Sequence, residues 1–504
     1  MEPSAERARA DEPEPEPEQE PEPDDAALLP GPQPSCCQGL CSARWGLAVV
    51  LHITLFMVYA LRVNLSMAIV AMTNATHPSN QANVSIDMCS NRSHARSDGS
   101  HPAFARGAPV YDWSAETQGI ILSSFFYGYI FTQMLGGYWA GTLGGKVVLG
   151  CGLFLTSALT LFVPLAAKLG VVYLIGLQVL LGLAEGVIFP AQYTLWAKWA
   201  PPMERSRLMN IADAGCTFGT FLAYLAAGFI CQCLGWPYIF YIFGGIGCIW
   251  SMFWFLLVYE DPARHPCISA RERDYIVSSL ASQGCSHGWS LPLKAMAKSL
   301  PLWAIAVACF CTDWLFYTLL TSMPTYMNNV LHFNIQENGL LSALPYVGNG
   351  LGHILSGLLA DLLLSRHVLS TAAVRKLFSA VGMLLPGAFL VAVSYIGCNY
   401  TAAVAFLTLS LTVNSTTGAG LNINHIDIAP RYAGFLLGIT NTFGIIAGII
   451  APTAVGFLTS QDLVAGWRNV FFLSAGIDLF GLLFYVAFGN GTIQDWAKED
   501  VANQ

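Results

Sequence analysis

Long apolar segments, separated by short polar ones, run along almost the whole chain from residue 45 onward. Each is close to the roughly 20 residues that an α-helix needs to cross the hydrocarbon core of a bilayer, where unpaired backbone groups find no water. The pattern therefore predicts an all-α membrane protein. Its twelve expected spans lie near 45–72, 118–142, 146–167, 171–196, 208–231, 236–258, 301–325, 339–363, 375–396, 402–421, 432–457 and 468–489.

Composition and charge agree with a membrane-embedded chain. Of the 504 residues, 54% are hydrophobic and 11% are charged, against roughly a quarter charged in soluble domains, which excludes a soluble enzyme. The formal net charge is -8, but eleven of the acidic residues precede residue 26, so the net charge says little about partners. The composition implies the lipid bilayer as a partner, and the charge pattern does not favour nucleic acid.

The basic residues indicate which side is cytoplasmic, because short cytoplasmic loops carry an excess of Lys and Arg. An even number of spans places both termini on one side. If that side is the cytoplasm, seventeen of the 23 Lys and Arg residues lie inside, five lie outside, and Arg62 lies within the first span. We therefore expect a cytosolic arm over 1–44, a cytosolic linker over 259–300 and a cytosolic tail over 490–504.

The arm before the first span has the composition of a disordered segment, since residues 11–25 are a Pro-Glu repeat. It ends in Asp24-Asp-Ala-Ala-Leu28-Leu29. An acid four residues before Leu-Leu is similar to the signal that sorting adaptors read for endosomes and lysosomes. This similarity favours the lysosomal membrane, with the apical plasma membrane as the alternative.

The loop over 74–117 falls on the side expected to be lumenal or extracellular. It holds three acceptor sequons, at Asn74, Asn83 and Asn91, and we expect them to be glycosylated. The fourteen cysteines show no metal-ligand spacing. Cys89 and Cys398 lie in expected outer loops, and the sequence leaves open whether they pair.

The two halves of the chain match each other. Segment 235–246 reappears as 466–477, with Gly, Trp, Phe, Gly and Ile at the same places and an offset of 231. Ala200-Pro201 before span five likewise recurs as Ala429-Pro430 before span eleven. Because transporters are often built from repeated helical bundles with the binding site between them, we expect two six-helix bundles, over 45–258 and 301–489.

Several motifs also carry a resemblance to a known family. They are Arg62-Val-Asn-Leu-Ser66, Ser124-Phe-Phe-Tyr-Gly-Tyr129, Glu185-Gly-Val-Ile-Phe-Pro190, Trp199-Ala-Pro-Pro-Met-Glu-Arg205, Ser299-Leu-Pro-Leu-Trp303, Gln336-Glu-Asn-Gly339 and Asn424-His-Ile-Asp-Ile-Ala-Pro430. Through them the chain resembles the major facilitator superfamily, and within it the anion transporters that include sialin, the vesicular glutamate transporters and the type I sodium-phosphate cotransporters. Residues 40–72 are most similar to sialin, whereas 235–247 and 494–498 are closer to the sodium-phosphate or organic-anion branch.

Two charged residues within spans are the main candidates for the transport site, because a charge at mid-bilayer costs several kcal/mol. Arg62 is the candidate for binding the substrate anion, since a guanidinium stays charged when buried and offers paired donors to a carboxylate. The resemblance implies the same role. Glu185, in a Gly-Leu-Ala-Glu-Gly run, is the candidate for proton coupling, and its flanking glycines allow close helix approach. The alternative for each is a structural role inside the bundle.

Other intramembrane acids are weaker candidates. Asp213, Asp313 and Asp478 are alternative proton sites, cation sites or partners for Arg62, and Asp313 is the strongest because span seven repeats span one. Asp361 and Asp427, near cytoplasmic ends, fit a gating role in which carboxylates hold the two halves closed. The resemblance also implies an arginine and a second glutamate at Gln178 and Leu181, and their absence puts strict sialin behaviour in doubt.

Three tyrosines are expected to bring hydroxyl groups and ring faces to the cavity: Tyr127, Tyr129 and Tyr317. The hypothesis that combines these residues is a secondary active transporter of small organic anions that works by alternating access. Proton-coupled symport of sialic acid or similar acidic sugars is the first expectation. A potential-driven or sodium-linked urate, phosphate or organic-anion transporter is the alternative. No cofactor, metal or catalytic group is expected, and the coupling ion is H⁺, with Na⁺ as the alternative.

Overall fold

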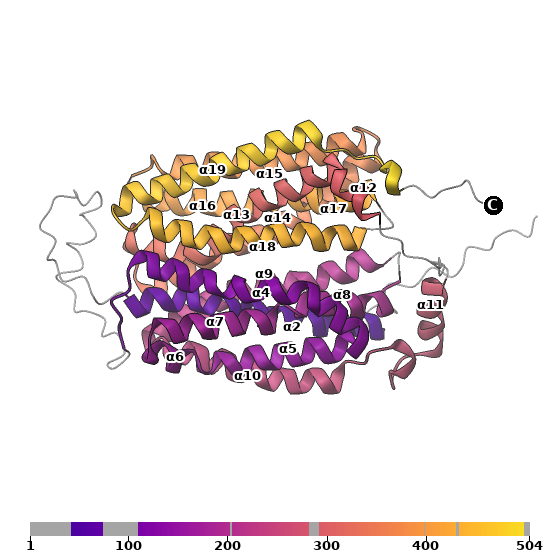
Figure 1. Ribbon diagram of the computed structural model, residues 1–504, viewed down its shortest axis with the longest axis horizontal. Helices are drawn as coiled ribbons and strands as arrows, with labels where there is room; N and C mark the ends of the chain where they lie inside the picture. Colours follow the sequence, from indigo (N-terminus) through magenta and orange to yellow (C-terminus); the bar gives the residue numbers. More distant parts are fainter. Residues whose placement is uncertain are drawn as a thin grey trace, which may run out of the picture. The chain divides into compact units, whose positions relative to one another are not determined.

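The computed structural model describes residues 42–73, 109–201, 204–281, 292–397, 399–429 and 433–497. The described residues before 259 form eight helices (Figure 1): α2 (Ala43–Thr73), α4 (Ala115–Leu143), α5 (Gly145–Thr160), α6 (Val163–Leu169), α7 (Val171–Glu185), α8 (Ile188–Trp199), α9 (Arg205–Cys233) and α10 (Pro237–Leu257). The linker contains η1 (Pro262–Arg264), α11 (Ala270–Ala281) and α12 (Leu293–Lys298). The rest contains α13 (Leu300–Asn329), α14 (Ile335–Ser365), α15 (Thr371–Val393), α16 (Tyr400–Asn414), the π-helical turn η2 (Gly418–Asn422), α17 (Ile423–Ile428), α18 (Ala433–Leu458), α19 (Leu463–Phe488) and η4 (Asp495–Ala497).

The expected spans have counterparts in these helices. Within the described ranges, nine helices are long and apolar enough to cross a membrane, and eleven if each of two bent pairs counts as one span. The bent pairs are Ala115–Gln133 with Leu135–Leu143, and α5 with α6. The remaining expected span, 402–421, corresponds to α16, which is only 15 residues long because the helix breaks after Asn414.

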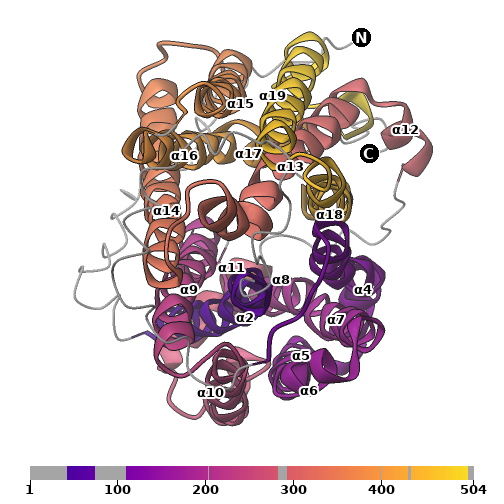
Figure 2. The ribbon, with the colours of Figure 1, turned by 90° about the vertical axis from the view of Figure 1, so that its left-hand side faces the viewer.

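The helices form two bundles with the same internal pairing (Figure 2). In the first bundle α2 packs on α9, α4 on α7 and α5 on α10. In the second, the repeat-related helices pair in the same way, since α13 packs on α18, α14 on α16 and α15 on α19. The two-bundle architecture expected from the internal repeat is therefore confirmed.

The bundles meet along two helix pairs, α9 with α14 and α4 with α18. At each contact two glycines lie opposite each other, Gly228 with Gly339 and Gly119 with Gly456, so that the backbones approach closely. A Cβ atom at Gly228 would lie 2.9 Å from the Cα atom of Gly339, closer than real Cβ atoms come. Glycine is therefore required where the bundles touch.

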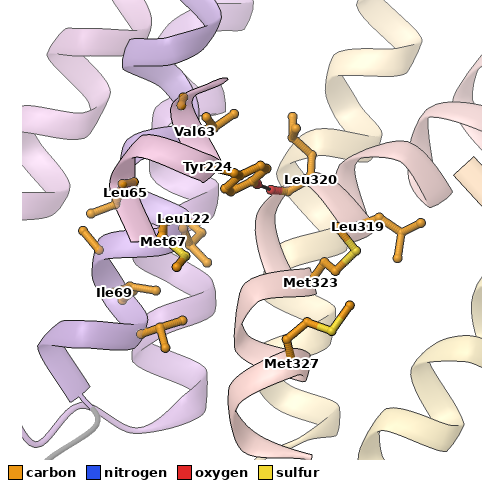
Figure 3. Packing of buried hydrophobic residues seen from close by; sticks show 14 of the residues in the cluster. Val63, Leu65, Met67, Ile69, Leu122, Tyr224, Leu319, Leu320, Met323 and Met327 are labelled. Atoms are coloured by element: carbon orange, nitrogen blue, oxygen red, sulfur yellow. Dashed lines mark hydrogen bonds between the residues drawn. The ribbon is translucent and has the colours of Figure 1, made fainter. Parts of the chain in front are cut away.

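Apolar side chains and hydrogen bonds complete this contact (Figure 3). Buried Met and Leu residues of α2 and α13 face each other across it, among them Met67 and Met323. The Tyr224 hydroxyl of α9 donates a hydrogen bond to the Leu320 carbonyl of α13. Because this bond joins the two bundles, it helps to hold them together.

The closest backbone contacts between the bundles lie at one end. We call the end where α2 stops and α4 starts the loop end, and the opposite end, which joins residues 259–300, the linker end. Both glycine pairs lie toward the loop end. Toward the linker end of the same helices, Gly141 of α4 and Gly438 of α18 have open space within 4 Å. Among the described glycines, the closest backbone approach between the two bundles is thus at the loop end.

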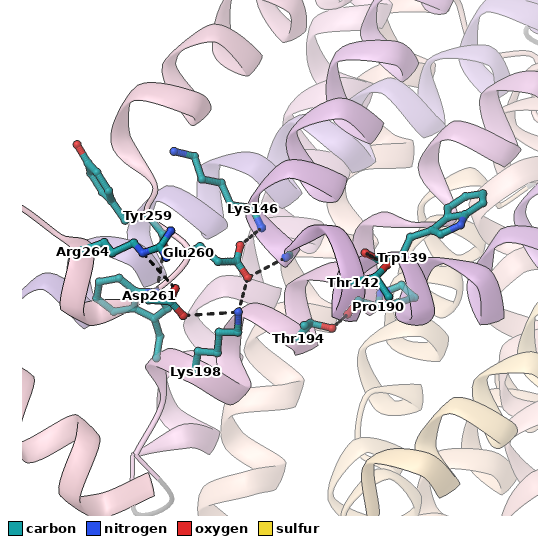
Figure 4. A network of polar contacts seen from close by, with 12 residues as sticks. Trp139, Thr142, Lys146, Pro190, Thr194, Lys198, Tyr259, Glu260, Asp261 and Arg264 are labelled. Carbon is teal, nitrogen blue, oxygen red and sulfur yellow. Dashed lines mark hydrogen bonds and ion pairs between the residues drawn. The ribbon is translucent and has the colours of Figure 1, made fainter. Parts of the chain in front are cut away.

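A polar network holds the linker end of the first bundle together (Figure 4). Glu260 accepts hydrogen bonds from the Lys198 Nζ at 2.8 Å, from the Gly145 amide at 3.0 Å and from the Lys146 amide at 2.8 Å. It thereby caps α5, which begins after Gly144 without a side-chain cap of its own. Partial burial raises the pKa of Glu260, but the bonds from Lys198 and from the two amides outweigh burial and hold its pKa below the usual value.

Replacing Glu260 with glutamine should lower stability at neutral pH but not in acid. The depressed pKa means that the carboxylate stabilises the folded state above the unfolded pKa, and that this contribution disappears as pH falls through the folded pKa. We expect a loss of about 1–3 kcal/mol at pH 7, the size of a charged hydrogen bond, measured as a lower apparent melting temperature. Glu260→Gln and wild type should converge once the pH falls below the lowered pKa of Glu260. The control is Asp274→Asn, in an exposed pair with Arg273, and an equal loss at both pH values would contradict the prediction.

Candidate functional site

The two main candidate residues form a buried ion pair. The Arg62 Nε atom of α2 donates to the Glu185 Oε1 atom of α7 at 2.7 Å, and the Nη2 atom lies 2.5 Å from the same oxygen. The side chains are only 4% and 1% exposed. Glu185, rather than Asp213, Asp313 or Asp478, is therefore the acid that pairs with Arg62. Within the described residues the second oxygen of Glu185 has no hydrogen-bond partner.

The glycines beside Glu185 let its helix pack closely enough on α4 for the carboxylate to reach Arg62. Glu185 is the last residue of α7, and Gly186 and Val187 form a break before α8. Gly182 and Gly186 press against the backbone of α4 at Phe125 and Tyr129, where a Cβ atom would collide with carbonyl oxygens. The close helix approach expected from the Gly-Leu-Ala-Glu-Gly run is thus present, and it brings the carboxylate to the middle of the bundle.

Aromatic rings surround the other faces of the guanidinium. The Arg62 Cζ atom lies 4.6 Å from the ring centre of Tyr59, 4.8 Å from that of Tyr129 and 5.2 Å from that of Phe125. Such cation–π contacts partly replace the hydration that a buried cation loses. Tyr129 was expected at the site, but Tyr59 was not. Its position three residues before Arg62 on the same helix is a signal that could have identified it.

A small cavity adjoins the ion pair. Its volume is about 20 Å³, room for about one water molecule and not for an organic anion. Gln178 and Leu181, where the family resemblance implies an arginine and a glutamate, both line it. An anion can therefore reach the guanidinium only if side chains around Arg62 move. The full lining is Leu61, Arg62, Leu65, Phe125, Thr156, Thr160, Val163, Gln178, Leu181, Glu185 and Phe240.

A larger cavity of about 490 Å³ lies between α13, α18 and α19. Its lining is apolar apart from one cysteine, so it offers no group that would select a small anion. We therefore place the candidate site at the ion pair.

The second bundle contributes Asp313 and Tyr317 on successive turns of α13. The Asp313 carboxylate lies directly against Gly444 of α18, where any side chain would collide with it. The Tyr317 ring contacts Phe126 of α4 at 4.9 Å between ring centres. Tyr317 thus brings a ring of the second bundle against the first bundle, one helical turn from Asp313.

Other candidates lie apart from this cluster. Asp427 forms an ion pair with Arg375 at 2.7 Å inside the second bundle, not across the two halves as expected. Asp213 accepts a hydrogen bond from Gln192 at 2.9 Å. Among the described contacts of Arg62 and Glu185, none involves Tyr127. For Asp361 the structure describes only the helical backbone.

Several predictions fall outside the described residues. They concern the sequons at Asn74, Asn83 and Asn91, the sorting signal at Asp24, Leu28 and Leu29, and the cysteines Cys89 and Cys398. Among the described residues, no group of three or more His, Cys, Asp or Glu side chains could hold a metal ion.

Two repeated helical bundles, the first of which holds a buried charged pair, form the architecture of many membrane transporters. A family model described as Major Facilitator Superfamily matches residues 51–452. The chain belongs to this superfamily and is a transporter, not an enzyme.

Individual proteins agree with this assignment. The chain is 51% identical to the probable small intestine urate exporter of Homo sapiens over 462 residues, which cover 92% of this chain and 93% of that protein. It is 48% identical to sialin of Homo sapiens, over 95% of each chain. A solved structure of a bacterial homologue of the human lysosomal transporter Spinster matches with a TM-score of 0.64 at 15% identity, covering 88% of this chain and 96% of that one. The resemblance to the family that includes sialin is confirmed.

Proposed function

We propose that this protein is a proton-coupled symporter of small organic anions, with sialic acid and similar acidic sugars as the first substrates to test. The observation that carries the proposal is the buried pair of Arg62 and Glu185, in which one carboxylate occupies a guanidinium within the first span. Similarity to sialin supports an acidic sugar as substrate.

The ion pair supplies a coupling mechanism. While Glu185 is ionised, it occupies the guanidinium and competes with any substrate carboxylate. A proton on Glu185 removes that competition, and the buried cation then favours a new anionic partner, because an unpaired buried charge is costly. The substrate anion and the proton would thus bind together and leave together. Asp313 is a second proton acceptor in this scheme, and Na⁺ is the alternative coupling ion.

The proposed orientation places the linker end in the cytoplasm, as the distribution of Lys and Arg predicts. In this orientation the site would open toward the cytoplasm at the linker end, and the closely packed loop end would face the lumen or the cell exterior. We place the protein in the lysosomal membrane, reached through adaptors that read the N-terminal arm, and we expect sugars on the loop over 74–117.

The second candidate function is potential-driven or sodium-linked transport of urate, phosphate or another organic anion at the plasma membrane. It is supported by 51% identity to the probable small intestine urate exporter. It differs from the first candidate in its driving force, because a potential moves a net charge whereas a symported proton neutralises the anion.

Uptake into proteoliposomes separates the two candidates. Radiolabelled sialic acid and urate are each offered under an acid-outside pH gradient and, separately, under an inside-positive potential without a pH gradient. The proposal predicts sialic acid uptake driven by the pH gradient. Urate uptake driven by the potential alone, with no response of sialic acid to pH, would replace it with the second candidate.

A further inference from the structure

The larger cavity of the second bundle has no role in the candidate site. It lies between α13, α18 and α19, has a volume of about 490 Å³ and is lined by four phenylalanine rings, those of Phe310, Phe443, Phe472 and Phe480. Phe480 is 59% exposed, and its helix α19 lies at the outer edge of the second bundle (Figure 2). The cavity is therefore open on the side where a membrane-spanning helix meets lipid chains.

The cavity lies in the half of the membrane next to the linker end, which we call the linker-side leaflet. On α13 its lining runs from Val307 to Cys311, about 10–17 Å along the helix from Leu300 at 1.5 Å per residue. Half of the hydrocarbon core of a bilayer is about 15 Å thick. The cavity thus has the depth of an acyl chain in the linker-side leaflet.

A stripe of side chains on α13 connects the cavity with the linker end. Trp303, Val307 and Phe310 are spaced by four and three residues, so they share one face of the helix. The Trp303 ring contacts the Phe443 ring of the cavity wall at 5.6 Å between centres, edge to face. Its Nε1 atom donates to the Ala297 carbonyl of α12 at 2.8 Å. One tryptophan, a residue typical of the membrane interface, therefore joins the cavity wall to α12.

The short helix α12 carries two cations close to this tryptophan. Lys294 and Lys298 are exposed, and among the described residues neither has an ion-pair partner. Met296, between them, is 2% exposed and packs in an apolar core with residues of α13, so it anchors the helix. The sequence contains no acidic residue between Asp274 and Asp313. Uncompensated positive charge thus lies at the linker end of the stripe that leads into the apolar cavity.

We propose that this part of the second bundle binds an anionic phospholipid of the linker-side leaflet. One acyl chain fills the apolar cavity between α13, α18 and α19, and the headgroup phosphate lies against Lys294 and Lys298. The two parts of the site match the two parts of one lipid, since the cavity alone would accept any chain and the lysines alone any anion. The proposed orientation places this leaflet at the cytoplasm, where anionic lipids are concentrated.

Photocrosslinking measures how often a lipid occupies the cavity. The full chain is reconstituted in phosphatidylcholine nanodiscs with a trace of either phosphatidylglycerol or phosphatidylcholine that carries the same diazirine-bearing acyl chain. After irradiation, peptide mass spectrometry quantifies crosslinks to residues 303–311 and 472–480. We expect at least fivefold more crosslinking with the phosphatidylglycerol probe, because lysines near the membrane surface attract anionic headgroups. Equal crosslinking by both probes in wild type would overturn the proposal.

Lys294→Gln with Lys298→Gln should remove the preference for phosphatidylglycerol and leave crosslinking at the level of the phosphatidylcholine probe. Both lysines are exposed, so this double variant should fold. Lys168→Gln is the matched control, because Lys168 is an exposed lysine in the last turn of α6, at the loop end, and it should retain the wild-type preference. An unchanged preference in the double variant would show that the lysines do not hold the headgroup.

Gly476→Phe should close the cavity. Gly476 lines it, and a Cβ atom there meets no heavy atom within 4 Å, so the new ring enters the space proposed for the acyl chain. Crosslinking by both probes should fall at least fivefold. Gly245→Phe is the matched control, since Gly245 is the repeat-related glycine of α10, 231 positions earlier, and also has open space. Undiminished crosslinking in Gly476→Phe would overturn the proposal.

Two further results would replace the phospholipid with another occupant and so reject the proposal. Cholesterol that displaces both probes equally from 303–311 and 472–480 would make the cavity a sterol site. Crosslinks to other spans but none to these segments would mean that protein covers the cavity. If Gly476→Phe fails to fold, shown by maleimide labelling of buried Cys231, the lysine variant decides. Because crosslinking needs no substrate and no gradient, an incorrect substrate or coupling ion leaves the result unchanged.

Discussion

Replacing Arg62 with alanine is expected to abolish anion transport and to destabilise the first bundle at the same time. The substitution removes the buried cation proposed to bind the substrate and leaves Glu185 without its ion-pair partner. Loss of one member of a buried pair typically costs 3–5 kcal/mol, and a lost charged contact with the substrate costs about 2–5 kcal/mol, which is at least 30-fold in affinity. Uptake into proteoliposomes and an apparent melting temperature measure the two effects.

A double variant separates binding from stability. Arg62→Met with Glu185→Gln removes both charges, so most of the lost stability should return while transport stays absent. Arg44→Gln is the control, since Arg44 is an ion-paired arginine on the same helix, bonded to Glu204 at 2.7 Å near the linker end, and it should retain transport. Wild-type uptake by Arg62→Ala, or recovery of transport in the double variant, would show that Arg62 only stabilises the fold.

Replacing Glu185 with glutamine should uncouple transport from the proton gradient without preventing exchange. Glutamine is neutral like the protonated acid, so it no longer competes for Arg62, and the anion site stays available at every pH. We expect exchange of internal for external substrate to continue, while accumulation driven by an acid-outside gradient falls at least tenfold. Exchange in Glu185→Gln should also lose the pH dependence of wild type.

Glu260→Gln is the matched control, because it also removes a carboxylate from an ion pair of the first bundle, but outside the membrane spans. Despite lower stability it should keep gradient-driven accumulation. Undiminished accumulation in Glu185→Gln would exclude Glu185 as the coupling acid. Asp313→Asn would then be the variant to compare.

The spans and the two bundles could be predicted from the sequence because each leaves a pattern that extends over many residues. Apolar length sets the spans, and the repeated motifs near 235 and 466 set the two halves. The sequence also identified Arg62 and Glu185, because a charge within an apolar segment is conspicuous. The break in span ten was not predicted, since its Thr and Gly residues are common in membrane helices and the packing against Gly352 and Gly382 is a tertiary feature.

The sequence alone could not predict which residues the charged side chains pair with. Arg62 and Glu185 lie 123 positions apart, and three other acids, Asp213, Asp313 and Asp478, were also possible partners for the arginine. Asp427 was expected to act between the halves, but its partner Arg375 lies 52 positions away in the same half. Pairing of this kind depends on how helices rotate against one another, which a single sequence with apolar residues on most faces does not specify.

The most direct test of the account is a simultaneous record of anion and proton movement in proteoliposomes that contain the full chain. A pH-sensitive dye reports the pH inside the vesicles, and no gradient is imposed. Inward sialic acid flux should acidify the interior in wild type. In Glu185→Gln, the internal pH should stay constant while the variant exchanges sialic acid. Sialic acid uptake by wild type without any acidification, in vesicles whose dye responds to added acid, would contradict proton coupling through the Arg62–Glu185 pair.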